Sequence, residues 1–179
     1  MMNIQKCVKI LEHKNADTLV LLNEANMHYL CGFSPSEGMV IVLKNGDAFH
    51  LVDSRYTETA ENHAKKTGLK VIEFKSSYYE ELAKIINNSK SESIVYESDT
   101  ISLKAFENIK KHCKNAQMIE LGDLLMRERN RKNVEEIVMM KKANQIAEKA
   151  FTELLNHVKP GKTEKELAAY FEYLMAKEG

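Results

Sequence analysis

The first 125 residues alternate between short apolar runs and longer stretches in which apolar positions recur every three or four residues. The short runs have the length of buried strands, and the longer stretches are typical of amphipathic helices. Asn45 and Gly46 separate two of the runs, which predicts a β-hairpin and therefore an antiparallel pair. Strands that alternate with helices indicate an α/β layered sheet. We therefore expect an α/β fold with a mixed β-sheet flanked by helices on both faces.

The expected strands lie within 17–23, 38–53 (two strands around the hairpin turn), 69–74, 93–97 and 116–121. The expected helices are marked by the apolar positions Ile4, Cys7, Val8 and Leu11, then Tyr56, Ala60 and Ala64, then Tyr78, Leu82, Ile85 and Ile86, and finally Leu103, Phe106, Ile109 and Cys113.

The character of the chain changes after Asp123. Residues 126–136 are dense in charge and have no strand pattern. A long helix should follow, because its apolar positions are spaced by three and four residues and Asn133 and Glu136 have the spacing of a helix cap. The expected domains are 1–125, an α/β domain, 126–133, a charged connector, and 134–179, a helical segment. The basic residues near the connector suggest either an anion patch or a solvated linker, and the acidic neighbours favour the linker.

A second helix is expected at the end of the helical segment. Thr163 and Glu166 follow a Pro-Gly turn with the spacing of a capping box. The apolar positions of this helix form a stripe that requires a packing partner. Six side chains of the two helices are expected to leave an apolar patch: Phe151, Leu154, Leu167, Phe171, Leu174 and Met175.

Charge and cysteine content exclude several classes of protein. Basic and acidic side chains number 26 each, so the formal net charge is zero. This balance gives no support to nucleic acid or an anionic membrane as a partner. The polar N-terminus is unlike a signal peptide, and no apolar stretch is long enough to cross a bilayer. Cys7, Cys31 and Cys113 are widely spaced and odd in number. We expect them to be reduced and buried, in a cytoplasmic protein.

Candidate chemistry is sparse. The six histidines are scattered without ligand spacing, and there is no phosphate-binding glycine loop and no nucleophile elbow. The stretch Asp53–Tyr56, with sequence DSRY, stands where a strand ends and a helix begins, an edge that often carries ligand sites in α/β sheets. Arg55 offers a planar fork of donors and Tyr56 a hydroxyl group. The alternative is a structural pair between Asp53 and Arg55 at the helix entry.

Four stretches together resemble the Xaa-Pro aminopeptidase, prolidase and creatinase family of metallopeptidases. The segment 26–33 resembles the family's N-x-x-Y-L-x-G-F, and 53–56 resembles its D-x-R-Y. The segment 129–137 resembles the R-x-x-K-x-x-x-E-I entry to the catalytic domain, and 159–167 resembles the P-G-x-T-E turn between that domain's first two helices. Cys31 departs from the pattern, since a hydroxyl residue is common there.

The resemblance implies a fold and a place in a larger enzyme. The fold would be the creatinase/prolidase N-terminal domain, with its ribonuclease H-like motif, followed by two helices of a truncated pita-bread domain. In the family, the pita-bread domain holds two divalent metal ions (manganese, cobalt or zinc) with ligands downstream of these two helices. The resemblance therefore implies that this chain contains no catalytic or metal-binding residue and that the final helix packs on the remainder of that domain.

The function implied by the resemblance is the N-terminal, non-catalytic portion of a metal-dependent Xaa-Pro peptidase. Such a portion shapes the active-site entrance and the homodimer, and the substrates are short proline-containing peptides. Arg55 and Tyr56 are the expected substrate or subunit contacts. The alternatives are a stand-alone binding or assembly module without catalysis, and part of a creatinase-like amidinohydrolase.

Overall fold

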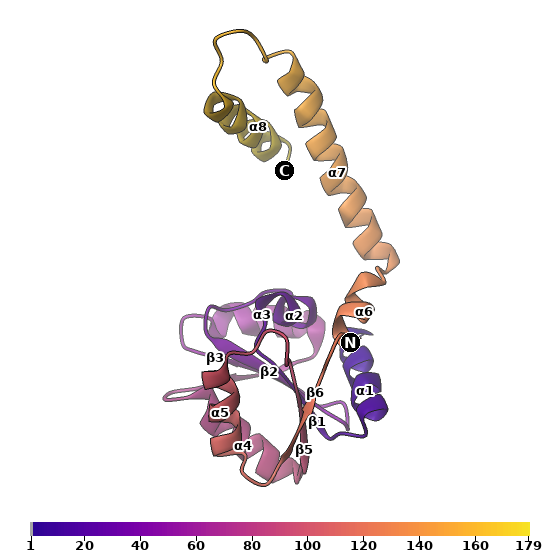
Figure 1. Cartoon of the computed structure of the whole chain (residues 1–179), viewed down its shortest axis with the longest axis vertical. Coiled ribbons are helices and arrows are strands. Elements are labelled where there is room, and N and C mark those ends of the chain that lie inside the picture. The colour runs from indigo at the N-terminus through magenta and orange to yellow at the C-terminus, as the bar shows by residue number, and fades with distance from the viewer. Residues whose placement is uncertain (1) are drawn as a thin grey trace. The chain divides into compact units, whose positions relative to one another are not determined.

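The computed structural model describes residues 2–179 and divides the chain into two compact units (Figure 1). The first unit extends to Asn130 and the second from Arg131 to Gly179. The strands are β1 Thr18–Leu21, β2 Gly38–Leu43, β3 Ala48–Val52, β4 Lys70–Glu73, β5 Ser93–Tyr96 and β6 Gln117–Glu120. The helices of the first unit are α1 Met2–Lys14, α2 Glu24–Cys31, α3 Thr57–Thr67, α4 Tyr78–Ser89, α5 Leu103–His112 and α6 Leu124–Asn130. Those of the second unit are α7 Val134–Leu155 and α8 Glu164–Glu178.

The described strands form one six-stranded mixed sheet, in the order β4-β3-β2-β1-β5-β6. Strand β2 runs antiparallel to both β1 and β3, and the hairpin turn at Asn45 and Gly46 joins it to β3. The other neighbours pair in parallel. All six residues of β2 are buried, as expected for a strand with helices on both sides of the sheet. The prediction of a mixed sheet is confirmed.

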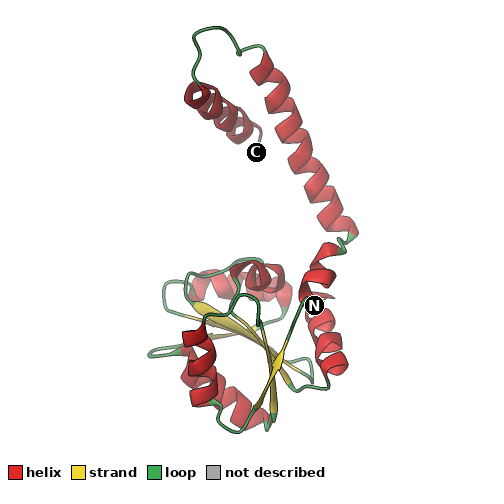
Figure 2. Cartoon of the chain, viewed as in Figure 1, coloured by secondary structure: helices red, strands yellow, loops and turns green. Residues whose placement is uncertain are grey.

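Helices cover both faces of this sheet (Figure 2). On one face, Leu11 of α1, Leu30 of α2 and Leu125 of α6 belong to one apolar core. On the other face, Leu82 of α4 and Ile109 of α5 belong to a second core. Each core buries the side chains that point to its own side of the strands, because successive strand residues alternate between faces. The prediction of a two-sided α/β fold is confirmed.

Helix α2 is not among the elements that the hydrophobic pattern predicts. It has only eight residues, so its apolar spacing repeats too few times to be recognised. Its ends nevertheless carry recognisable signals. Asn23 caps the N-terminus by accepting a hydrogen bond from the backbone of Asn26, and Gly32 ends the helix with a φ of 80°. This helix positions the first family-like stretch.

Helix α6 occupies most of the segment expected to be a charged connector. Leu125 is buried in the core, and Arg129 donates a hydrogen bond to Asn26 of α2. Residues 124–130 therefore pack within the first unit, although their sequence is dominated by charge. The hydrophobic pattern misses the helix because only Leu125 of its seven residues is fully buried.

The second unit consists of α7 and α8, and the cap expected at the start of each helix is present as a capping box. Asn133 pairs with Glu136, and Thr163 pairs with Glu166. In each pair, the side chain of either residue accepts a hydrogen bond from the backbone N–H of the other. Such boxes satisfy donors that have no partner inside the helix. The sequence signals for the starts of both helices are therefore confirmed.

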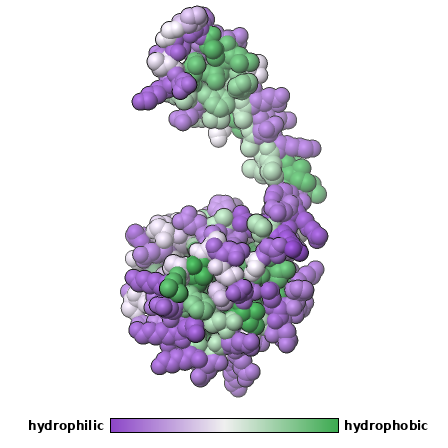
Figure 3. Space-filling model, in the orientation of Figure 1, coloured by the Kyte–Doolittle hydropathy of each residue, from purple (hydrophilic) through white to green (hydrophobic). Residues whose placement is uncertain are grey.

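The expected apolar patch is partly packed between the two helices. Leu174 is buried, and the rings of Phe151 and Phe171 meet edge to face, with centroids 6.3 Å apart. Figure 3 shows hydrophobic side chains gathered on this unit. Phe151 nevertheless remains 51% exposed. Five further apolar side chains are exposed at the start of α7: Val134, Ile137, Val138, Met139 and Met140.

The three cysteines are buried and free of disulfide bonds, as expected. Burial raises the pKa of Cys7 and Cys31 to about 12 and that of Cys113 to about 11. Their thiols therefore stay protonated at neutral pH and react slowly. Within residues 2–179, no helix combines the length and the hydrophobicity needed to cross a membrane.

Candidate functional site

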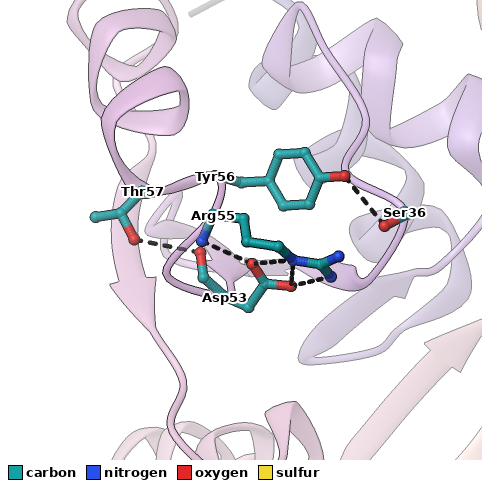
Figure 4. Close-up of polar contacts among 5 residues, drawn as sticks. All are labelled: Ser36, Asp53, Arg55, Tyr56 and Thr57. Carbon is teal, nitrogen blue, oxygen red and sulfur yellow. Dashed lines mark hydrogen bonds and ion pairs between the residues drawn. The ribbon is translucent and has the colours of Figure 1, made fainter.

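The DSRY stretch forms a tight turn between β3 and α3 (Figure 4). The Asp53 carboxylate accepts a hydrogen bond from the backbone N–H of Arg55 at 2.9 Å. It also accepts hydrogen bonds from Nη2 and Nε of the same arginine, at 2.6 and 3.2 Å. Hydrogen bonding to Arg55 lowers the pKa of Asp53. The structural pair considered from the sequence is therefore present. The Arg55 side chain remains 64% exposed, so it is also accessible to another molecule.

Tyr56 lies beside Arg55 and is tied to a neighbouring loop. Its hydroxyl group lies 3.1 Å from the hydroxyl group of Ser36, and the guanidinium carbon of Arg55 lies 5.4 Å from the centre of its ring. The hydrogen bond with Ser36 lowers the pKa of Tyr56. The two expected site residues are therefore brought together on one surface of the first unit.

An aromatic cluster underlies Tyr56. The ring of Phe33 lies 6.5 Å from that of Tyr56 and 5.1 Å from each of His50 and His63, measured between centroids. Phe33 ends the first family-like stretch, so the structure joins that stretch to DSRY. Its neighbour Gly32 permits this contact, because a Cβ atom there would lie 2.6 Å from Nδ1 of His63.

His50 is the buried member of this cluster, with 2% of its surface exposed. Its Nε2 atom has no hydrogen-bond partner among the residues that the structure describes. Burial lowers the pKa of His50 to about 4, and the proximity of His63 contributes. The imidazole is therefore neutral at physiological pH and acts as an interior group. Among residues 2–179, no three histidine, cysteine or carboxylate side chains are grouped closely enough to hold a metal ion.

A second polar site lies at the carboxyl ends of β1 and β5, and the sequence did not indicate it. Glu97 follows β5 directly and is 5% exposed. One of its carboxylate oxygens, Oε2, accepts the backbone N–H groups of Leu22 and Asn23 at 2.6 and 2.8 Å. The other, Oε1, accepts the side-chain amide of Asn26 at 2.6 Å. The signal that could have indicated this site is a carboxylate placed immediately after an apolar strand.

Asn26 connects this site to α6, since its Oδ1 atom accepts a hydrogen bond from Nη1 of Arg129 at 2.8 Å. Asn26 begins the N-x-x-Y-L-x-G-F stretch and Arg129 begins the R-x-x-K-x-x-x-E-I stretch. The two lie 103 residues apart in the sequence. The fold therefore connects the first residues of two of the four family-like stretches.

Comparison with known families gives two matches in sequence order. Residues 3–131 match the Creatinase/Prolidase N-terminal domain, and residues 138–179 match Metallopeptidase family M24. A relative is the Xaa-Pro dipeptidase of Pyrococcus furiosus, which is 30% identical over 98% of this chain and 48% of its own length. The chain spans about half the length of the curated relatives that it matches.

Solved structures give the same result. The Xaa-Pro dipeptidase from Bacillus anthracis superposes on the whole chain and on 49% of its own length, with a TM-score of 0.91 and 27% identity. The X-Pro aminopeptidase from Thermotoga maritima superposes on 96% of this chain, over 49% of its own length. The TM-score is 0.85 and the identity is 30%. The chain is thus similar to one part of these larger proteins, across both of its units.

Proposed function

From the premise that this chain belongs to the creatinase/prolidase N-terminal domain family and continues into M24 sequence, we propose that it is the N-terminal part of a metal-dependent Xaa-Pro peptidase. The observation that supports the proposal is the order of the two family matches, 3–131 and 138–179. In addition, 98% of this chain aligns with an Xaa-Pro dipeptidase. The substrates would be short proline-containing peptides, and the complete enzyme would be a homodimer.

In this proposal the two parts of the chain have different roles. The domain at 1–125 borders the active-site entrance, and residues 134–179 supply the first helices of the catalytic domain. The segment 126–133 joins them, and its first part belongs to α6 of the first unit. Two divalent metal ions, of manganese, cobalt or zinc, would be held by M24 residues outside this chain. When bound, such a pair supplies a hydroxide nucleophile and polarises the scissile carbonyl group.

The start of α7 supports an incomplete catalytic domain. Residues 137–140 are four consecutive exposed apolar residues, and their side chains point to different sides of the helix because helix positions advance by about 100° per residue. A helix that is apolar around much of its circumference is normally buried in a larger protein. The missing cover would be the remainder of the M24 domain.

The proposal predicts activity only in a longer protein. The purified 179-residue chain should not hydrolyse Xaa-Pro dipeptides or longer Xaa-Pro peptides with added manganese or cobalt. A protein in which this chain continues into the remainder of an M24 domain should hydrolyse them. Metal-dependent turnover by the chain itself would contradict the division of roles. Hydrolysis of an amidino substrate by the longer protein, with peptides untouched, would instead favour a creatinase-like enzyme.

We further propose that Arg55 and Tyr56 contact the substrate or the partner subunit in the complete enzyme. The exposed guanidinium group suits a carboxylate, since it presents donors in a planar fork. Tyr56 is held beside it by Ser36 and by the ring of Phe33. Asp53 orients the arginine, since its Oδ2 accepts hydrogen bonds from both Nε and Nη2 and its Oδ1 accepts a further one from Nε. An ordered and exposed arginine binds at a smaller entropic cost than a freely moving one.

Replacing Arg55 tests this role in the longer protein. Arg55→Ala should lower kcat/KM about ten- to a hundred-fold, because a hydrogen bond to a charged group contributes about 1.5–3 kcal/mol. The melting temperature should change little, because an exposed ion pair contributes at most about 1 kcal/mol. Lys84→Ala is the matched control, since Lys84 is also 64% exposed and pairs with Glu81 at 2.7 Å. Lower thermal stability with full activity per folded molecule would make Arg55 a structural residue.

A further inference from the structure

The carboxyl ends of β1 and β5 form a crevice of the kind that binds ligands in other α/β sheets. The two strands are parallel neighbours in the interior of the sheet. The chain leaves β1 for α2, whose buried side chains belong to the core on one face, and leaves β5 for α5, which packs on the other face. Where connections depart in opposite directions, the strand ends leave a crevice.

In this protein its own carboxylate occupies that crevice. Glu97 is buried and accepts three hydrogen bonds, two of them from the backbone N–H groups that precede α2. The N-terminus of a helix favours negative charge through its unpaired N–H groups and its dipole. Glu97 therefore fills the position that an anionic ligand would take, and its remaining partner is Asn26.

Asn26 links Glu97 to α6 through two hydrogen bonds. Its amide donates to Glu97, and its carbonyl oxygen accepts from Arg129, so both ends of the side chain are engaged. Arg129 lies one turn after Leu125, and residues four apart share a helix face. Leu125 is 1% exposed in the core. Helix α6 is thus held on one face by an apolar contact and by a charged hydrogen bond.

We propose that Glu97, Asn26 and Arg129 are positioning residues that hold α6 on the N-terminal end of α2. They thereby fix the point at which the chain leaves the first unit, since α6 ends at Asn130. A hollow of about 200 Å³ lies beside these three residues. Because they bind one another, the proposal assigns them an anchoring role and no ligand. It rests on contacts within this chain and does not require the proposed peptidase activity.

Hydrogen exchange of the 179-residue chain tests the anchor. Arg129→Gln should increase amide exchange in α6 about tenfold, because local opening no longer has to break the charged hydrogen bond. Amides of β1 and β5 should change by less than about twofold, which distinguishes a local anchor from a general loss of stability. Arg127→Gln is the matched control, since Arg127 belongs to the same helix but pairs with Asp123 four residues earlier. Equal effects of the two variants would overturn the proposal.

Two further variants test whether the anchor acts through Asn26 and Glu97. Asn26→Ala should raise exchange in α6 as much as Arg129→Gln does, and the double variant should add little to Asn26→Ala alone. Glu97→Gln keeps the side-chain shape but presents a donor where the carboxylate accepts, so exchange should rise in the first turn of α2 and in α6. Fully additive effects of Asn26→Ala and Arg129→Gln would show that Arg129 acts through another residue, which contradicts the proposal.

Discussion

Glu97→Ala should lower the free energy of unfolding of the first unit by about 3–5 kcal/mol, the largest effect of a single substitution that we expect. The substitution removes the acceptor of three hydrogen bonds, those of Leu22, Asn23 and the Asn26 amide. A buried donor without a partner costs about 1–3 kcal/mol, and water entering the adjacent hollow would recover part of this. Urea unfolding followed by circular dichroism measures the change.

Glu120→Ala provides the control for this measurement. Glu120 also stands at the carboxyl end of a parallel strand, β6, but it is exposed. Its replacement should change stability by less than about 0.5 kcal/mol, as is usual for surface positions. Similar losses for the two variants would mean that the buried hydrogen bonds of Glu97 contribute little.

His50 should make the first unit sensitive to acid. Burial lowers the pKa of His50 to about 4, whereas the ordinary value of 6.5 applies to the unfolded chain. Between these values the unfolded chain binds a proton that the folded protein does not, so the free energy of unfolding falls as the pH falls from 6.5 to 4. Each pKa unit corresponds to about 1.4 kcal/mol, which gives a total loss of about 3 kcal/mol. Above pH 6.5 this contribution is constant.

His50→Leu should remove this part of the pH dependence. Leucine does not titrate, and it also eliminates the buried Nε2 atom that has no partner among the described residues. The variant should match the original protein within about 1 kcal/mol at pH 7.5 and exceed its stability by about 2–3 kcal/mol at pH 4.5. His13→Gln is the control, because His13 is an exposed histidine near the end of α1. The idea fails if the slope persists in His50→Leu.

Part of the candidate site could be predicted from the sequence. Asp53, Arg55 and Tyr56 lie within one short stretch, and its position directly after an apolar strand is enough to place them at a sheet edge. Their packing could not be predicted in the same way. The contact of Tyr56 with Phe33, and that of Phe33 with His50 and His63, depend on how β3, α2 and α3 meet. The signal for these contacts lies in several separate segments, so no single stretch contains it.

Local sequence signals were sufficient for the alternation of strands and helices, the hairpin, the two capping boxes and the family resemblance. All but the resemblance depend on residues only a few positions apart, whose spacing follows directly from helix and strand geometry. The resemblance depends on four short stretches in order along the chain. The assembled fold was needed to show that α2 and α6 are helices of the first unit and that Glu97, Asn26 and Arg129 meet. Those residues lie 71 and 103 positions apart, and the order of the strands brings them together. Local periodicity carries no information about a contact of that kind, because the contact exists only once the sheet has been assembled.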